Sequence, residues 1–425
     1  MAKELHELNE LEERVILVAV EMDERSSRSA MDTDACLDEL EELVKTAGGT
    51  AVARSVQKRE RIHPGHYLGT GKIEELKAML LAYDATGIVC DDELSPAQLR
   101  NLEQMLGTKV MDRTIVILDI FAARALSGEG KIQVELAQLK YRLSRLTGMG
   151  ASMSRLGGGI GTRGPGEKKL ETDRRYIKER IAELNKDAQE IRTHRELLRA
   201  QRSKKGTPVI SLVGYTNAGK STILNRLSDA GVLAEDKLFA TLDTTTRKIE
   251  LPGGSEVFLT DTVGFIQKLP HHLVQAFRAT LEELQYILLH VVDASDANRA
   301  EHIEVVYDTL RSLGCEDTPV ITVFNKMDRE VELPLPMDTM ARDIVQVSAQ
   351  NGDGMDVLLE RVEKLLQSFR KSITALVPYT EGSLIGWIHG RCEIIREEHT
   401  GEGVLLEVYV DEESANRLEK FKVNE

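Results

Sequence analysis

The first 125 residues alternate short apolar runs with amphipathic stretches. Apolar runs bounded by polar turns predict strands, and stretches with a helical apolar period predict helices. The expected strands are 15–20, 50–56, 87–90 and 114–118, and the expected helices are 34–45, 69–81 and one beginning near Pro96. Strands that alternate with helices are typical of a parallel sheet, so we expect this part to form an α/β domain.

A helical period takes over after Lys131. One apolar stripe recurs at spacings of four and three, at Ile132, Leu136, Leu139, Leu143 and Leu146. A second stripe comprises Ile177, Ile181, Leu184, Ala188 and Ile191. Two such helices should pack antiparallel through their stripes. Between them, residues 157–166 contain six glycines in ten positions, which makes regular structure too costly in entropy. We expect a helical hairpin with a flexible tip.

A third pattern, of buried strands, begins at 208. The expected strands are 208–213, 255–260, 319–324 and 343–347, followed by an amphipathic helix at 355–369. The tail predicts a helix near 384–392, a strand at 403–410 and a final helix from Glu412. The predicted fold class is α/β. It comprises an N-terminal α/β domain (1–127) with a helical hairpin (128–206), a central domain with a mostly parallel sheet and helices on both faces (207–372), and a small C-terminal α+β domain (373–425).

A glycine-rich turn joins the strand at 208–213 to a helix that begins at Lys220. It has the phosphate-loop pattern, with residues Gly214, Tyr215, Thr216, Asn217, Ala218, Gly219, Lys220 and Ser221. Such a loop points backbone N–H groups at a phosphate, and the helix N-terminus adds partial positive charge. Lys220 can reach the β and γ oxygens, while the Ser221 hydroxyl can coordinate Mg²⁺. The sequence therefore predicts a nucleotide site with magnesium.

The strand at 255–260 supplies the next part of this site. It ends in Asp261, Thr262, Val263 and Gly264. Asp261 can hold the hydration shell of the magnesium ion, and the Gly264 amide can meet the γ-phosphate. The motif is uninformative alone, but its place at a strand end after a phosphate loop gives it weight.

The end of the strand at 319–324 indicates which base is bound. It carries Asn325, Lys326, Met327 and Asp328. A carboxylate at Asp328 can accept two hydrogen bonds from guanine, whereas adenine offers no such donor pair. Asn325 can address the other edge of guanine or brace the phosphate loop, and the Lys326 stem can cover the ring. Amides of Ser348, Ala349 and Gln350 can contact the guanine O6. The set favours GTP over ATP.

These motifs resemble those of translation-factor-like small GTPases, and two strings are similar to the HflX family. The strings are 214–221 and the residues Phe239, Ala240, Thr241, Leu242 and Asp243; glycines and a tyrosine at 67–72 also resemble that family. The resemblance implies a P-loop GTPase domain that hydrolyses GTP, with 239–243 contacting the nucleotide. It also implies that Thr241 joins Ser221 on Mg²⁺.

The residues alone leave Thr244, Thr245 and Thr246 open as alternative metal ligands, because each hydroxyl lies in the same stretch. We expect Lys220, Thr241 and Gly264 to act in hydrolysis. Ras-like enzymes place a glutamine directly after the motif that corresponds to 261–264, where it orients the attacking water, but this chain has Phe265 there. The hypothesis is that the free enzyme hydrolyses GTP slowly and a partner supplies or orders the missing group. The alternative is that Gln267 or a switch-I threonine positions the water.

Charge is unevenly distributed along the chain. The net charge is −15, yet residues 131–205 hold 19 Lys and Arg against 9 Asp and Glu, a net of +10, so the remaining 350 residues carry −25. A basic element on an acidic protein suits RNA phosphates, although a solvated helical surface has the same composition. The HflX resemblance implies that this hairpin reaches rRNA of the large ribosomal subunit. The expected partner is the ribosome, bound by a monomer.

Composition excludes several other classes. No run approaches the length of a membrane span, and the N-terminus lacks the apolar core of a signal peptide, so we expect a cytoplasmic protein, at most peripheral to a membrane. Cys36, Cys90, Cys315 and Cys392 form no CxxC pair, which argues against a zinc site or a disulfide framework.

The resemblance implies that GTP binding and hydrolysis are coupled to ribosome splitting or to the rescue of stalled ribosomes, as in a stress response. One alternative is a GTP-controlled binding module for a protein or membrane-associated partner, with the hairpin as a dimerisation arm. Another is an RNA remodelling factor that also uses ATP through the turn 69–72, which is either a shortened phosphate loop or a helix entry.

Overall fold

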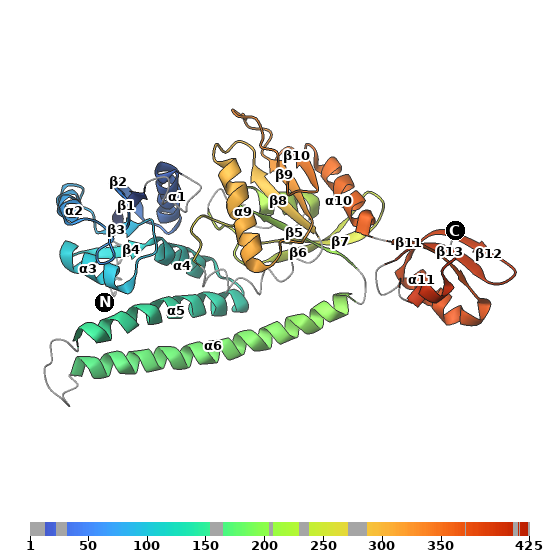
Figure 1. Ribbon diagram of the computed structural model, residues 1–425, viewed down its shortest axis with the longest axis horizontal. Coiled ribbons are helices and arrows are strands. Elements are labelled where there is room, and N and C mark those ends of the chain that lie inside the picture. The colour runs from blue at the N-terminus through green and yellow to red at the C-terminus, as the bar shows by residue number, and fades with distance from the viewer. Residues whose placement is uncertain are drawn as a thin grey trace, which may run out of the picture.

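The computed structural model describes residues 13–22, 32–153, 165–203, 207–228, 238–270, 287–369, 371–410, 415 and 417–423. Three sheets follow one another in chain order, and two long helices run along one side of the first two (Figure 1). The predicted α/β class is confirmed: a parallel N-terminal sheet, a mixed central sheet and a small antiparallel C-terminal sheet.

The N-terminal sheet is parallel throughout, in the order β2-β1-β3-β4. Its strands are β1 (Arg14–Met22), β2 (Thr50–Arg59), β3 (Gly87–Cys90) and β4 (Lys109–Asp112). The helices between them are α1 (Thr33–Thr46), α2 (Thr70–Ala82) and α3 (Pro96–Leu106). The predicted strands at 15–20, 50–56 and 87–90 are confirmed, and so are the three helices. Their apolar faces cover both sides of the sheet.

The strand predicted at 114–118 is wrong, because this run lies in α4 (Arg113–Arg124). The fourth strand is the short β4 just before it, and the Asp112 carboxylate caps the helix by accepting from Ile115 N at 3.1 Å. The run contains β-branched residues and is apolar on every side, so periodicity could not separate a buried helix from a buried strand. The segment is buried nearly all round, which explains its uniform composition.

The predicted hairpin consists of α5 (Gly128–Met153) and α6 (Pro165–Ser203), which pack side by side (Figure 1). Its glycine tip lies largely outside the described residues. The predicted stripe on α6 is its less exposed side, with Leu184 fully buried. Helix α5 buries more than the predicted seam, because it also packs on α3 and α4 through Val134, Ala137 and Tyr141. Arg180 of α6 meets Glu135 of α5 at 2.8 Å.

The central sheet has the order β10-β9-β8-β5-β7-β6, with only the edge strand β6 antiparallel to its neighbour. Its strands are β5 (Val209–Gly214), β6 (Thr245–Glu250), β7 (Glu256–Asp261), β8 (Ile287–Asp293), β9 (Val320–Asn325) and β10 (Asp343–Gln346). The described helices are α7 (Lys220–Ser228), α9 (Arg299–Leu313) and α10 (Met355–Phe369). Four strands and two helices match the prediction; β6, β8 and α9 were not predicted.

The C-terminal sheet is antiparallel, in the order β11-β13-β12. Its elements are β11 (Lys371–Val377), α11 (Gly382–Arg391), β12 (Glu393–His399), β13 (Val404–Val410) and short 3₁₀ turns at Tyr379–Glu381 and Glu419–Phe421. The start of the final helix predicted from Glu412 lies outside the described residues. Within the part of the chain that is described, no helix is long and apolar enough to cross a membrane.

A buried histidine of β8 makes stability depend on pH. His290 is 1% exposed, and burial lowers its pKa to about 4 despite the nearby Asp338 carboxylate. His290 of the unfolded chain therefore takes up a proton below about pH 6.5, whereas His290 of the folded chain stays neutral until about pH 4. The free energy of unfolding is not reduced by His290 above pH 6.5, and it is reduced progressively as the pH falls from 6.5 toward 4. His290→Gln should reduce the loss of unfolding free energy between pH 7.5 and 5 by roughly 2 kcal/mol. Urea melts of both proteins at the two pH values measure this difference; equal losses would contradict it.

Candidate functional site

The phosphate loop between β5 and α7 depends on two glycines with positive φ. Gly214 has φ +150°, and a Cβ there would lie 2.2 Å from the Val291 carbonyl oxygen. Gly219 has φ +94°, and a Cβ there would lie 2.2 Å from Nδ2 of Asn325. Any larger residue would displace β8 or β9. The loop is therefore wrapped tightly against the ends of its neighbouring strands.

Lys220 lies inside this loop. Its side chain is 6% exposed, and Nζ donates to the carbonyls of Tyr215 at 2.7 Å and Gly214 at 3.1 Å. Burial lowers the pKa of Lys220 to about 8, while the Asp261 carboxylate opposes the shift. A small pocket beside the ammonium is lined by Thr216, Gly219, Ser221, Ala240, Thr241 and Gly264, among others. An anionic group bound there would face a buried cation and a helix N-terminus.

Three oxygen-bearing side chains from separate elements meet at this pocket. Ser221 Oγ donates to Asp261 Oδ2 at 2.6 Å and lies 2.8 Å from Thr241 Oγ1. Asp261 Oδ1 is buried and has no hydrogen-bond partner among the described residues. Burial raises the pKa of Asp261, and Lys220 opposes that rise. Hydroxyl and carboxylate oxygens with spare acceptor capacity are the ligands Mg²⁺ prefers, so the residues present fit this ion.

Among the four candidate threonines, only Thr241 joins this cluster. Thr245 and Thr246 lie in β6, and the Thr246 hydroxyl is 3.0 Å from that of Thr260. Pairing of β6 with β7 therefore holds Thr245 and Thr246 in the sheet. Thr244 immediately precedes the strand. The geometry favours Thr241 over the alternatives that the residues alone left open.

The turn after β7 contacts the phosphate loop directly. Thr262 Oγ1 donates to the Leu212 carbonyl at 2.6 Å. A Cβ on Gly264 would lie 2.8 Å from the Thr216 Cα and 3.0 Å from Lys220 Nζ, so glycine allows this close approach. Phe265 N donates to the Gly214 carbonyl at 3.0 Å, and the Phe265 ring is buried in the core. Val263 is also a core residue. Only the backbone of this turn is presented to the pocket.

The strand ends at β9 and β10 come together where the base motif was predicted. Asn325 Nδ2 donates to the Ala218 carbonyl at 3.0 Å, and Asn325 Oδ1 accepts from Ala349 N at 3.0 Å. Asn325 thus ties the loop after β10 to the phosphate loop, which favours the bracing role. Ser348 Oγ donates to Asp328 Oδ1 at 2.6 Å, and this bond lowers the pKa of the Asp328 carboxyl.

The rest of the base motif is arranged around these two residues. Lys326 has φ +64°, and its Nζ lies 2.7 Å from Asp293. Met327 N donates to the Val347 carbonyl at 3.2 Å, while Gln350 is exposed. Asp328 is exposed and held by Ser348, so its carboxylate is presented to solvent at the edge of the site.

The five residues 239–243 divide between the pocket and the protein core. Phe239, Ala240 and Thr241 line the pocket. Phe239 is buried and meets Phe121 of α4 edge to face, with ring centroids 4.6 Å apart, and Leu242 is buried in the same cluster. The Asp243 carboxylate accepts hydrogen bonds from Leu126 N and Ser127 N, at the base of the hairpin. A contact between Asp243 and the nucleotide stays a prediction.

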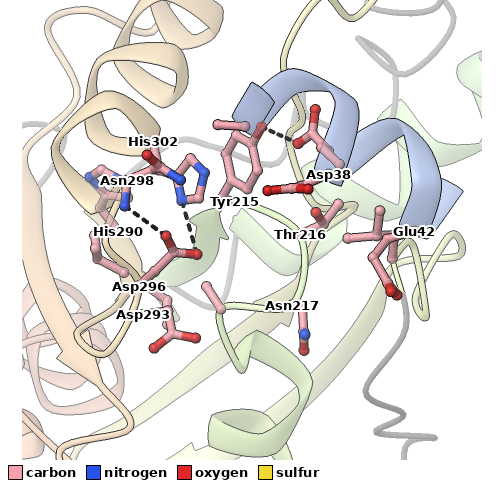
Figure 2. Close-up of a pocket in the computed structure, with 16 residues that line it drawn as sticks. Asp38, Glu42, Tyr215, Thr216, Asn217, His290, Asp293, Asp296, Asn298 and His302 are labelled. Atoms are coloured by element: carbon pink, nitrogen blue, oxygen red, sulfur yellow. Dashed lines mark hydrogen bonds and ion pairs between the residues drawn. The ribbon is translucent and has the colours of Figure 1, made fainter. Parts of the chain in front are cut away.

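The sequence alone did not predict that α1 lines a cavity beside the phosphate loop. A cavity of about 240 Å³ lies between α1, the loop and the start of α9, and Figure 2 shows its lining. The Tyr215 ring stacks on His302 with centroids 3.7 Å apart, and its hydroxyl donates to Glu39 of α1. Gln267 N donates to the same hydroxyl at 3.0 Å. Nothing local in the sequence links Glu39 to residues far along the chain.

A buried chain of charges continues from Glu39. Arg113 is 1% exposed and pairs with Glu39 and, at 2.6 Å, with Asp91. Lys268, four residues after Gly264, pairs with Asp91 and, at 2.7 Å, with Asp92. Burial raises the pKa of Asp91 to about 6, against the attraction of Lys268. These pairs join the N-terminal sheet to the segment after β7, and apolar residues of both parts form one continuous core cluster.

The N-terminal turn 69–72 is a helix entry in this structure. Gly69 precedes α2, and its N–H donates to Gln57 at 2.9 Å. Lys72 pairs with Glu75 of the same helix at 2.7 Å. Its ammonium is thus turned along α2, unlike Lys220, which lies inside its loop.

A phosphate loop after β5, a metal-suited oxygen cluster at the end of β7 and an exposed carboxylate after β9 together define a P-loop GTPase. Family models agree: residues 34–122 match "GTP-binding GTPase N-terminal", 124–202 match "GTP-binding GTPase Middle Region" and 209–326 match "50S ribosome-binding GTPase". The chain is 57% identical over 412 residues to GTPase HflX of Lacrimispora saccharolytica, covering 96% of each chain. The protein belongs to the HflX GTPase family and is a GTP hydrolase.

Other relatives cover most of the chain too. GTPase HflX of Caldanaerobacter subterraneus is 47% identical over 422 residues, covering 99% of this chain and 96% of the relative. The Escherichia coli protein is 43% identical over 353 residues, covering 82% and 83%. Among solved structures, the SsGBP and GDP complex covers 83% of this chain and 98% of its own, at 23% identity and a TM-score of 0.43.

Proposed function

We propose that the protein is a GTP-driven factor that binds the large ribosomal subunit through its helical hairpin and acts in the cytoplasm as a monomer. GTP binding and hydrolysis would then be coupled to the splitting of ribosomes or the rescue of stalled ones. The observation that carries the proposal is the joining of a GTPase site to a basic hairpin within one fold, together with the match of 209–326 to a ribosome-binding GTPase family.

The proposed nucleotide site assigns a role to each side chain. Lys220 neutralises charge on the β- and γ-phosphates, and Ser221 and Thr241 hold Mg²⁺, with Asp261 ordering its water. When bound, Mg²⁺ would neutralise negative charge on the phosphates. The Gly264 amide meets the γ-phosphate, and Asp328 selects guanine. Loss of the γ-phosphate would release the segments that carry Thr241 and Gly264, which makes the site a switch.

The basic surface is concentrated in parts of the hairpin. Residues 131–153 carry 4 Lys and Arg against 1 acidic residue, whereas 171–193 carry 6 of each sign. Lys131, Lys140 and Arg142 of α5 are exposed. Since the apolar faces of α5 are covered by α3, α4 and α6, the helix has its packing partners within one chain. This arrangement supports RNA phosphates as the target of the exposed cations, rather than a second copy of the hairpin.

Co-sedimentation with ribosomes and separated subunits tests this proposal. We expect binding to the large subunit with a non-hydrolysable GTP analogue, weaker binding with GDP, and a steep decline with added salt. Reversal of Lys131, Lys140 and Arg142 to glutamate should weaken binding, while the same change at Lys45, Lys58 and Lys77 of the N-terminal domain serves as a charge-matched control. Binding that ignores both nucleotide and salt would contradict the proposal and favour a protein partner.

Slow hydrolysis by the free enzyme follows from the residues after Gly264. The Phe265 ring is buried and apolar, and Gln267 is 3% exposed, with its side-chain oxygen accepting from the Cys36 thiol on α1. Neither side chain is placed to orient water at the pocket. Gln267→Ala should therefore leave basal hydrolysis within about twofold, and ribosomes should raise the rate of both proteins. A large basal loss in Gln267→Ala, measured by phosphate release, would assign the water to Gln267 instead.

A further inference from the structure

The segment around Thr241 is held in place by residues outside the GTPase sheet. On one side of Thr241, Phe239 is 2% exposed and packs edge to face on Phe121 of α4. On the other side, Asp243 accepts hydrogen bonds from Leu126 N and Ser127 N, immediately before α5. Leu242, between Thr241 and Asp243, is buried in the cluster shared with the N-terminal sheet. The hydroxyl at the metal cluster is thus fixed by anchors two residues away in each direction.

The Asp243 anchor is a complete hydrogen-bonded cap. Its Oδ2 accepts from Ser127 N at 2.8 Å and from Leu126 N at 3.0 Å, and its Oδ1 accepts from the Ser127 hydroxyl. Ser127 Oγ in turn accepts from Gly130 N at 2.9 Å, in the first turn of α5. A carboxylate at a helix N-terminus is also favoured by the helix dipole. Asp243 therefore completes the start of the hairpin's first helix.

The hairpin side of the contact is shaped to receive the carboxylate. A Cβ on Gly130 would lie 2.5 Å from Asp243 Oδ1 and 3.0 Å from Ser127 Oγ. An alanine there would push the carboxylate away without removing any hydrogen-bonding group. The contact can accordingly be broken from α5, with the GTPase segment left unchanged.

We propose that Asp243 is a positioning residue for GTP hydrolysis. It fastens residues 238–246, the switch segment, to the base of α5. This contact holds the Thr241 hydroxyl beside Ser221, 2.8 Å away, and links movement of the hairpin to the metal cluster. The inference rests on the proposed role of Thr241 as a magnesium ligand. Asp243 touches neither nucleotide nor metal in this role; it acts through Thr241, because only one residue separates them.

Hydrogen exchange of the nucleotide-free protein gives a readout that needs no bound ligand. Asp243→Ala and Gly130→Ala should each raise exchange at residues 238–246 at least about fivefold, because the anchor limits local opening. Asp32→Asn is the matched control: Asp32 caps α1 by accepting from Thr33 N at 2.8 Å, and its side chain makes no hydrogen bond to residues 238–246 in the described part of the chain. It should leave exchange at 238–246 unchanged.

Hydrolysis kinetics then test the positioning role itself. Both variants should lower kcat about tenfold and raise the Mg²⁺ concentration that gives half the maximal rate about tenfold. The KM for GTP at saturating Mg²⁺ and the affinity for GDP without magnesium should each stay within about twofold of the unmodified protein. The double variant should behave like either single variant, because both break one contact. A role limited to folding would instead lower thermal stability without moving the magnesium dependence.

The outcomes separate this inference from the proposed metal role. If Thr241→Ala leaves the magnesium dependence unchanged, Thr241 is not a ligand and the proposed function of that residue fails. If Thr241→Ala shifts it but Asp243→Ala and Gly130→Ala do not, the positioning role is overturned. Additive effects in the double variant would also overturn it. Should Asp243→Ala fail to fold, Gly130→Ala alone decides, since it keeps every polar group of the contact.

Discussion

Asp328→Asn should cost GTP affinity at least about a hundredfold and shift the base preference toward xanthine. The carboxylate is exposed at the site edge and fixed by the Ser348 hydroxyl at 2.6 Å. Guanine presents two donors to it, and each hydrogen bond to a charged acceptor is worth more than a neutral one. An asparagine amide would set a donor against one of these donors, whereas the C2 carbonyl of xanthine would accept from it.

Competition of GTP, XTP and ATP against a fluorescent GDP analogue measures this change. Ser348→Ala is the matched control, because it removes the hydrogen bond that orients Asp328 but leaves the carboxylate. It should weaken GTP binding only about five- to tenfold, with the base preference retained. An unchanged ranking of the three nucleotides in Asp328→Asn would show that the base is read elsewhere.

The nucleotide centre was predictable because its chemistry is local in sequence. Lys220, Asp261 and Asp328 each lie at or shortly after the carboxyl end of an apolar strand, and parallel strands bring these ends to one edge of the sheet. The choice of Thr241 rather than its neighbours came from family resemblance and stays a prediction; its hydroxyl lies 2.8 Å from that of Ser221.

The surroundings of that centre were not predictable in the same way. Glu39 and Arg113 carry no local signal, since a charged residue on a helix is usually a solvated one, and only the fold brings them beside Tyr215. The contact between Asp243 and Ser127 likewise joins positions 116 residues apart. The run at 114–118 was misjudged for a different reason: burial on all sides erased the period that distinguishes helix from strand.

Arg113→Met should lower the free energy of opening of the N-terminal sheet by about 3–5 kcal/mol, because Glu39 would stay buried without its cationic partner and Asp91 would keep only Lys268. The only tryptophan, Trp387, lies in the C-terminal part and does not report on this sheet. Hydrogen exchange at β1 and β3 therefore provides the measurement. Arg54→Met is the control: its pairs with Asp38 and Glu41 are exposed, so the expected cost is below about 1 kcal/mol.

A second variant tells whether the loss comes from stranded charge or from the missing guanidinium stem. Adding Glu39→Gln to Arg113→Met removes one uncompensated carboxylate and should recover part of the stability, at least about 1 kcal/mol. Glu39 also accepts from the Tyr215 hydroxyl in the phosphate loop, so the same substitution should loosen that loop. Faster exchange at residues 214–219, together with slower exchange in the N-terminal sheet, would show that the buried charges couple the phosphate loop to that sheet. If exchange changes equally in the loop and the sheet, the buried charges only stabilise the packing of the loop against the sheet.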